Sequence, residues 1–227
     1  MYDRPRMVPK KAPPEALQYP RYGGLLPRHA AIAERHRGDM GTVLGNYRGM
    51  RTLPPPPVRT ELVVELNEIV QRQAQSTSDE REFAIHVDPD ENHYRLWSDE
   101  VERLTGMRHP PSYFDAIATN AQGFMLSLKG EFDMARPYQV APIMGKRIAM
   151  LVSDPKTPSY PSGHAFEAYL FALTMDEMHP RQSFEFFALA DMVADSRIVA
   201  GVHYPSDIVA GRSAAVIAHA IRKDMGP

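Results

Sequence analysis

Residues 159–178 have the sequence SYPSGHAFEAYLFALTMDEM, a proline-containing approach followed by a run of apolar residues. Ser162 is a natural N-cap, and Gly163 lets the backbone approach a ligand closely. The apolar residues that follow are Ala165, Phe166, Tyr169, Leu170 and Leu173. This stretch therefore predicts a helix over about 163–178 whose first free N–H groups form an anion site beside His164.

Helical spacing of apolar residues recurs on both sides of this stretch. The other helices that we expect cover about 60–73, from 77 onward, 92–106, from 111 towards 136, 181–194 and 205–223. In the first of them, one side consists of Leu62, Val63, Leu66, Ile69 and Val70. The segment 138–160 holds several prolines, so we expect a loop there, with one short strand-like run over 148–152.

The order of these elements determines the fold class. Strands alternating with helices are not expected anywhere, and no repeat of about 20–50 residues occurs. We therefore predict an all-α protein, a helical bundle with an irregular loop over one end. At 227 residues the chain is long enough to bury a sizeable core.

The N-terminal quarter differs from the rest in composition. Ten of the 21 prolines lie in residues 1–60. This region contains 11 Lys and Arg and 4 Asp and Glu, a net charge of +7, whereas the remainder contains 15 and 24, a net charge of −9. We predict a basic, proline-rich arm over 1–58 and a helical domain over 59–227. The composition leaves open whether this arm wraps the domain, joins a neighbouring subunit in a homo-oligomer, or is a disordered tail.

Composition also bounds the compartment and the chemistry. The hydrophobic fraction of 43% and the charged fraction of 24% are those of a soluble globular protein. No run of about 18 uninterrupted apolar residues is present, so no transmembrane segment is expected. The N-terminus lacks the apolar region of a signal peptide, which predicts a cytoplasmic protein, or a periplasmic or secreted one if a signal preceded residue 1. The absence of cysteine excludes disulfides and thiolate chemistry.

Three separated clusters hold the residues suited to chemistry. In the first, Lys129 and Arg136 are seven positions apart, so on one continuous helix both cations would share a face. The second is 162–164, and the third contains Arg197, His203 and Asp207. Taken singly, each has an ordinary structural explanation: a solvated basic face, a capped helix, or a surface histidine beside a capping aspartate.

The spacing of the third cluster predicts a local geometry. Pro205 fits the first turn of the last helix and places Asp207 about two residues inside it. His203 then lies just outside that helix, with the Asp207 carboxylate within reach of its Nδ1. A carboxylate in this position fixes the tautomer and raises the basicity of the opposite ring nitrogen, Nε2.

Together the three clusters supply what phosphoryl transfer requires, namely cations to stabilise charge, a nucleophile and an acid. No metal site is expected, because other histidines of the chain lack carboxylates at ligand spacing. These are His86, His93, His109 and His179. The positive charge at such a site would therefore come from side chains.

Between Lys129 and Asp207 the chain contains, in order, Lys-x6-Arg-Pro, Pro-Ser-Gly-His and Ser-Arg-x5-His-x3-Asp. This pattern resembles the signature of the type-2 phosphatidic acid phosphatase superfamily. That superfamily includes soluble bacterial class A non-specific acid phosphatases, membrane lipid phosphatases and vanadium-dependent haloperoxidases. With its proline run at 54–57, the chain is most similar to the class A acid phosphatases. The resemblance implies a helical bundle of the acid phosphatase and haloperoxidase type.

The resemblance also implies a role for each matched residue. His203 would attack phosphorus and form a phosphohistidine, Asp207 would hold His203 in register, and His164 would serve first as the acid and then as the base. The phosphate-binding residues that it implies are Lys129, Arg136, Ser162, Gly163 and Arg197. Neither a metal nor another cofactor is implied.

We therefore expect a metal-independent phosphomonoesterase that acts on a small, water-soluble phosphate ester, with no nucleic-acid partner and with vanadate as an inhibitor. Three alternatives remain open. In a vanadium-dependent haloperoxidase, the same pocket would hold vanadate as a cofactor and His203 would be its ligand. A lipid or prenyl phosphate phosphatase would act peripherally at a membrane. A binding or structural protein would keep the fold without the reaction.

Overall fold

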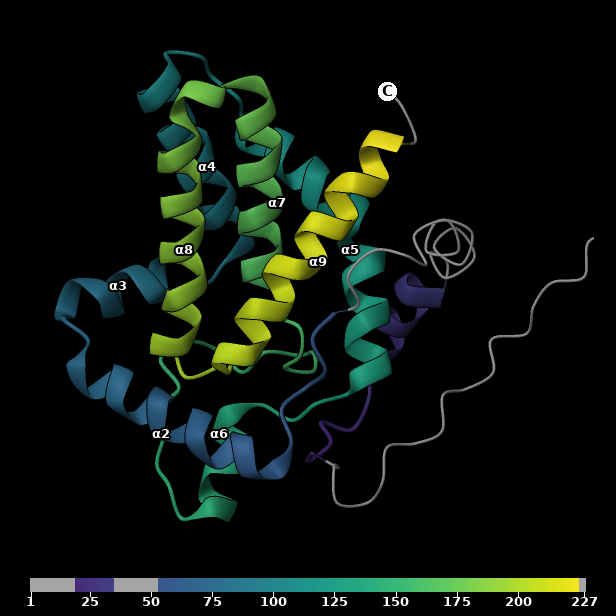
Figure 1. The fold of residues 1–227 in the computed structure, drawn as a ribbon, viewed down its shortest axis with the longest axis vertical. Coiled ribbons are helices and arrows are strands. Elements are labelled where there is room, and N and C mark those ends of the chain that lie inside the picture. Colours follow the sequence, from purple (N-terminus) through teal and green to yellow (C-terminus); the bar gives the residue numbers. More distant parts are fainter. Residues whose placement is uncertain (1–18, 35–52, 225–227) are drawn as a thin grey trace, which may run out of the picture.

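The structure is a computed structural model, which describes residues 19–34 and 53–224 (Figure 1). After a helical segment at 27–34, its long helices are α2 (Arg59–Gln75), α3 (Ser78–His86), α4 (Asp90–Thr105), α5 (Pro111–Phe132), α7 (Gly163–Met178), α8 (Ser183–Val199) and α9 (Pro205–Asp224). The short elements are α6 (Pro137–Val140) and the 3₁₀ turns η2 (Ala141–Met144) and η3 (Pro180–Gln182). The described residues form no strand beyond one isolated bridge, so the predicted all-α class is confirmed. Across them, no helix combines the length and apolarity needed to cross a membrane.

Several helix ends lie where the sequence signals predict them. Thr77 caps α3: its hydroxyl accepts from the Glu80 N–H, and the Glu80 carboxylate accepts from the Thr77 N–H. Gly106 ends α4 in the left-handed conformation, at φ 73°. Pro205 opens α9, where a residue without a backbone N–H loses no hydrogen bond.

Helix α7 is the centre of the bundle and packs along α8 and α9, while α4 and α5 complete the core (Figure 1). Its buried residues are Ala165, Phe166, Ala168, Tyr169, Leu170, Phe171, Ala172, Thr174 and Met175. A helix that is apolar on nearly all sides is stable only when neighbours enclose it. Phe171 meets Trp97 of α4 and Phe114 of α5 edge to face, with ring centroids 5.7 and 5.1 Å apart. These contacts fix α7, and with it the N-terminal turn that carries His164.

Helix α5 ends earlier than expected. Its last residue is Phe132, and Asp133 follows in a left-handed conformation, at φ 49°. The Asp133 carboxylate accepts hydrogen bonds from the N–H groups of Gly23 and Gly24, at 3.1 and 2.6 Å. The expected helix from 111 towards 136 is therefore wrong in its last turn, because a contact with the N-terminal segment stabilises a non-helical conformation there.

The expected strand-like run over 148–152 is also wrong. The Ala149 N–H donates to the Gln73 side-chain oxygen at 3.0 Å, and the Leu151 N–H donates to the Ala200 carbonyl at 3.1 Å. These acceptors belong to the end of α2 and the turn after α8. The run thus finds its hydrogen-bond partners in a side chain and a helix end, and no second strand among the described residues pairs with it.

Helix α2 faces the core with fewer residues than expected. Leu62, Leu66 and Ile69 are fully buried, whereas Val63 and Val70 keep 39% and 37% of their surface exposed. The five residues expected on one side of α2 thus divide into three that are fully buried and two valines that are partly exposed. Helix α2 crosses the end of the bundle instead of running along it, so only a narrow face of the helix meets the core (Figure 1).

The described part of the N-terminal region packs on the helical domain. The Tyr19 hydroxyl donates to the Phe132 carbonyl at 2.9 Å, and the Tyr22 hydroxyl donates to the Pro155 carbonyl at 2.8 Å. These contacts join the segment to the end of α5 and to the loop before α7. Most of the predicted arm lies outside the described residues, so the boundary at residue 58 and the role of the arm in a homo-oligomer stay predictions.

Candidate active site

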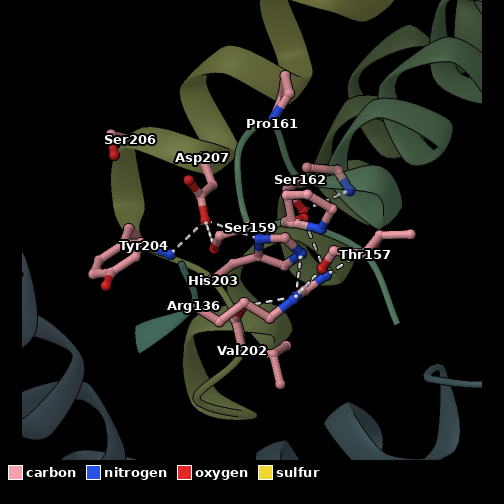
Figure 2. Close-up of polar contacts among 12 residues, drawn as sticks. Arg136, Thr157, Ser159, Pro161, Ser162, Val202, His203, Tyr204, Ser206 and Asp207 are labelled. Atoms are coloured by element: carbon pink, nitrogen blue, oxygen red, sulfur yellow. Dashed lines mark hydrogen bonds and ion pairs between the residues drawn. The ribbon is translucent and has the colours of Figure 1, made fainter. Parts of the chain in front are cut away.

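A pocket of about 210 Å³ lies at the end of the bundle where α7 and α9 begin and α8 ends. Its lining residues are Asp88, Lys129, Arg136, Ser153, Pro155, Thr157, Gly163, His164, Arg197, Val202 and His203. Six of the eight residues singled out in the sequence are among them. The other two, Ser162 and Asp207, are fully buried next to lining residues (Figure 2).

His203 is held by Asp207 through a buried hydrogen bond. Its Nδ1 donates to Asp207 Oδ2 at 2.9 Å, which confirms the contact that the spacing predicts. Asp207 Oδ2 also accepts from Ser159 Oγ at 2.6 Å and from the Tyr204 N–H at 3.0 Å (Figure 2). Three donors thus fix the carboxylate, and the carboxylate fixes the His203 tautomer with its proton on Nδ1.

The other ring nitrogen of His203 faces the cations of the pocket. Its Nε2 lies 3.2 Å from Arg136 Nη1, which can only donate, so Nε2 presents its lone pair. Burial lowers the pKa of His203 well below its usual value, and the positive charges of Arg136 and Lys129 lower it further. His203 is therefore an unprotonated base at neutral pH.

Lys129 and Arg136 reach the pocket by a route that their spacing did not predict. Lys129 lies in the last turn of α5, whereas Arg136 follows the end of that helix and precedes α6. The two cations therefore do not share a helix face, and that prediction is wrong. The left-handed turn at Asp133 redirects the chain, and both side chains still line the same pocket.

Neutral carbonyl groups hold these two cations. Lys129 Nζ donates to three carbonyls of the loop before α7, those of Pro158, Ser159 and Pro161, at 2.7, 3.2 and 2.6 Å. Arg136 donates from Nε to the Thr157 carbonyl at 2.9 Å and from Nη1 to the Val202 carbonyl at 2.8 Å. Carbonyl oxygens satisfy the N–H groups without cancelling the charge, so the pocket keeps a positive field that favours an anion.

Arg197 pairs with a carboxylate that the sequence did not reveal. It lies in the last turn of α8, which extends to Val199 and thus past the expected end at 194. Its Nη1 donates to Asp88 Oδ1 at 2.9 Å, and its guanidinium is buried. Asp88 lies in the turn between α3 and α4, 109 residues away along the chain, so no local spacing indicates the pair.

His164 also depends on Asp88. Its Nε2 donates to the Asp88 carbonyl at 3.0 Å, which leaves Nδ1 for proton exchange in the pocket. Burial lowers the pKa of His164 well below its usual value, and the charge of Arg197 lowers it further, while the bond to Asp88 opposes this shift. His164 is therefore neutral at neutral pH and needs the negative charge of a bound anion to become an acid.

A second buried histidine supports the ring of His164. His93 of α4 stacks on His164, with centroids 5.4 Å apart and planes inclined by 25°. Trp97 Nε1 donates to His93 Nε2 at 3.2 Å, which places the His93 proton on Nδ1, 3.5 Å from Glu167 Oε2. Burial lowers the pKa of His93 to about 3, so the ring stays neutral. A lone histidine on an apolar helix face gives no sequence signal for this role.

The start of α7 lies at the pocket, as the sequence predicts. A Cβ on Gly163 would contact only Lys129 Cε, at 3.9 Å, so the glycine leaves the backbone open towards the pocket. Ser162 Oγ accepts from the Ala165 N–H at 3.4 Å and acts as the N-cap. Ser162 is fully buried and does not line the pocket, so its contact with phosphate stays a prediction.

Binding of a dianion is expected to draw a proton into the pocket. The pKa of His164 is lowered in the free protein, and the two negative charges of a bound dianion would raise it. At a pH between the pKa of the free protein and that of the complex, the complex holds a proton that the free protein lacks. Sulfate is a suitable probe, because it has no titrating group near pH 7. Calorimetry in buffers of different ionisation enthalpy should show net proton uptake at pH 7. The His164→Gln variant should lose most of it, and proton release by the unsubstituted protein would contradict this assignment.

Comparison with known proteins agrees with this site. Residues 113–224 match the PAP2 superfamily. A non-specific acid phosphatase of Salmonella typhimurium (strain LT2) is 39% identical over 57 residues, 25% of this chain and 23% of that protein. A lipid A 1-phosphatase of Rhizobium etli is 38% identical over 53 residues, 23% of each chain. The crystal structure of a bacterial vanadium-dependent iodoperoxidase has a TM-score of 0.54 at 15% identity, over 77% of this chain and 50% of that one.

These likenesses differ in what they establish. The chain spans about a quarter of the two curated relatives, and the similarity to the iodoperoxidase shows the fold alone. The matched region contains every residue from Lys129 to Asp207, and therefore all eight residues singled out in the sequence. The chain thus contains a PAP2 superfamily domain over residues 113–224, 112 of its 227 residues.

Proposed function

We propose that this protein is a phosphatase, a phosphoric monoester hydrolase in which His203 is the nucleophile. The observation that carries the proposal is the lone pair of His203 Nε2, fixed in place through Asp207 and presented among three cations. The names of the two curated relatives, an acid phosphatase and a lipid A 1-phosphatase, support the same class of reaction.

In the first half-reaction, His203 Nε2 donates its lone pair to phosphorus while the bond from phosphorus to the leaving oxygen breaks. His203 Nδ1 keeps its proton, and the Asp207 carboxylate stabilises the positive charge that develops on the ring. His164 gives the proton on its Nδ1 to the leaving oxygen, and the alcohol departs. The product is a phosphohistidine at position 203.

In the second half-reaction, water attacks the phosphorus of the phosphohistidine. His164, now neutral, accepts a proton from that water at Nδ1. The bond between phosphorus and His203 Nε2 breaks, its electron pair returns to the ring, and phosphate leaves. His164 ends the cycle protonated, as it was with substrate bound.

The charge of the transferring phosphoryl group would be stabilised by Lys129, Arg136, Arg197 and the Gly163 N–H at the start of α7. Lys129 and Arg136 would exchange contacts with neutral carbonyls for stronger contacts with charged oxygens. These side chains can supply the positive charge that metal ions supply in other phosphatases. We therefore propose a metal-independent reaction.

The size of the pocket limits what it encloses. Its volume of about 210 Å³ is below the roughly 300–1,000 Å³ of pockets that surround a drug-sized ligand. It suits a phosphoryl group, with the leaving group extending past Ser153, which is exposed at the rim. A small, water-soluble monoester is therefore the proposed substrate.

Hydrolysis of p-nitrophenyl phosphate tests the proposal. The protein should release p-nitrophenol in the presence of EDTA, and vanadate should inhibit competitively, because it mimics the five-coordinate phosphorus of the transition state. A parallel assay with vanadate, peroxide and bromide should give no bromination. Activity that EDTA abolishes and a divalent cation restores would overturn the metal-independent reaction. Bromination without hydrolysis would favour a haloperoxidase, and no turnover of any phosphate ester would favour a binding protein.

A further inference from the structure

The segment after α6 forms a surface that the proposed reaction does not use. It lies with α2 and α6 at the same end of the bundle as the start of α7 and hence the pocket (Figure 1). A groove of about 720 Å³ opens there. It is lined by Tyr138, Pro142, Gly145, Lys146, Arg147, Ile148 and Ala149. We define the basic-apolar patch as the following residues around this groove: Val63, Val70, Ile143, Lys146, Arg147 and Met150.

The apolar part of the patch comes from two elements that are in contact. Ile143 is 73% exposed and Met150 is 39% exposed. Val63 and Val70 are two of the three exposed valines of α2. Val63 lies four residues before Asn67 and Val70 three residues after it, so both share its helix face. Asn67 accepts a hydrogen bond from the Lys146 ammonium, so that face of α2 adjoins the segment after α6.

Neither cation of the patch has an ion-pair partner among the described residues. Lys146 bonds to a neutral side-chain amide, that of Asn67. Arg147 is exposed, and no hydrogen bond or ion pair joins its side chain to another described residue. The patch therefore presents two positive charges that no ion pair joins to a described residue, between exposed aliphatic side chains. By contrast, the exposed Arg95 of α4 pairs with Glu91.

We propose that the basic-apolar patch docks on an anionic lipid surface. Aliphatic side chains that project beside lysine and arginine fit the boundary between lipid headgroups and acyl chains. Each cation near an anionic leaflet strengthens such binding. The charge complementarity and the aliphatic tips of Ile143 and Met150 together favour a lipid surface over a second copy of the chain, which would place like charges opposite each other.

Docking would bring the rim of the pocket close to that surface. Tyr138, which lines the groove, donates from its hydroxyl to Asp154 Oδ1 at 2.5 Å. The two neighbours of Asp154 in the chain, Ser153 and Pro155, line the pocket. The groove and the pocket are thus linked through this hydrogen bond, although the docking itself does not depend on the proposed chemistry.

Co-sedimentation with vesicles tests the docking. The full chain should bind vesicles of phosphatidylcholine mixed with phosphatidylglycerol, should not bind phosphatidylcholine alone, and should be released by salt. A Lys146→Ala, Arg147→Ala double variant should bind about 30-fold more weakly, which is about 1 kcal/mol for each cation. An Ile143→Asp variant should also lose most of the binding. Both variants should hydrolyse p-nitrophenyl phosphate like the unsubstituted protein, which shows that the pocket is intact.

Phe184 offers the matched control for the docking. It is 81% exposed near the start of α8, roughly 20 Å along the helix from Arg197 and the pocket. The Phe184→Asp variant should therefore bind vesicles normally. The proposal would be overturned if the protein did not bind the anionic vesicles, or if the patch variants bound them as well as the unsubstituted protein does. Self-association that requires the patch would also overturn it. If the unsubstituted protein did not hydrolyse p-nitrophenyl phosphate, the vesicle result would still be valid, because the two measurements are independent.

Discussion

The His203→Gln variant is expected to turn over p-nitrophenyl phosphate at least about 10³-fold more slowly than the unsubstituted protein. Glutamine is similar in length but has no ring nitrogen that can attack phosphorus. The remaining cations of the pocket would still bind the substrate, because Lys129 and Arg136 are held by loop carbonyls and Arg197 by Asp88. The loss should therefore appear in kcat and leave KM nearly unchanged.

Two controls separate this chemical effect from unfolding. The His203→Gln variant should keep its helical circular dichroism and its affinity for vanadate. The His179→Gln variant alters another buried histidine, at the opposite end of α7, and should retain activity within about twofold. A His203→Gln protein with more than a tenth of the original kcat would exclude His203 as the nucleophile.

The Asp207→Asn variant is expected to lose about 10²- to 10³-fold in kcat with little change in structure. Asp207 Oδ2 also accepts from the Tyr204 N–H, which can only donate, so the amide oxygen of asparagine would take this position and the His203 tautomer would persist. Burial raises the pKa of Asp207 to about 6, although the bonds from Ser159 and Tyr204 oppose the rise, so the carboxylate is charged at pH 7. The replacement therefore removes the negative charge that stabilises the His203 ring as it becomes positive. Single-turnover rates at pH 7 would measure the loss.

The Ser159→Ala variant is the matched control for Asp207. It deletes one of the three donors to Asp207 Oδ2 but leaves the carboxylate and the His203 tautomer in place. A loss of no more than about tenfold is expected, in keeping with one hydrogen bond to a charged group. Equal losses in the Asp207→Asn and Ser159→Ala variants would show that Asp207 acts through local structure and not through its charge.

The parts of the site that could be predicted are those encoded by short spacing. Pro205 and Asp207 lie in one helical turn, so the contact of Asp207 with His203 follows from helix geometry. The N-cap at Ser162 and the open backbone at Gly163 are likewise local. In these places, neighbours within five or six positions in the sequence determine the local structure, and the structure agrees with the prediction.

The parts that could not be predicted depend on residues distant in sequence. Arg136 does not share a helix face with Lys129, because Asp133 is drawn out of the helix by the N-terminal segment. Asp88 positions Arg197 and His164 from another helix pair, and neither contact has a local signal. The same limit applies to the fold: hydrophobic spacing indicated a strand-like run at 148–152, but whether an extended run forms a strand depends on the presence of a partner strand.

Trapping of the phosphorylated protein tests the proposed role of His203 more directly than any rate. A phosphorus–nitrogen bond survives alkali and breaks in acid, so the protein is mixed with p-nitrophenyl phosphate, quenched in alkali and digested for mass spectrometry. We expect a phosphoryl group on the peptide that contains His203, absent after acid quench and absent from the His203→Gln variant. The His164→Ala variant should accumulate more of it, because it lacks the base for the second half-reaction. The mechanism would be contradicted if the protein were active but neither the unsubstituted chain nor the His164→Ala variant carried a phosphoryl group. A phosphoryl group on another residue would also contradict it.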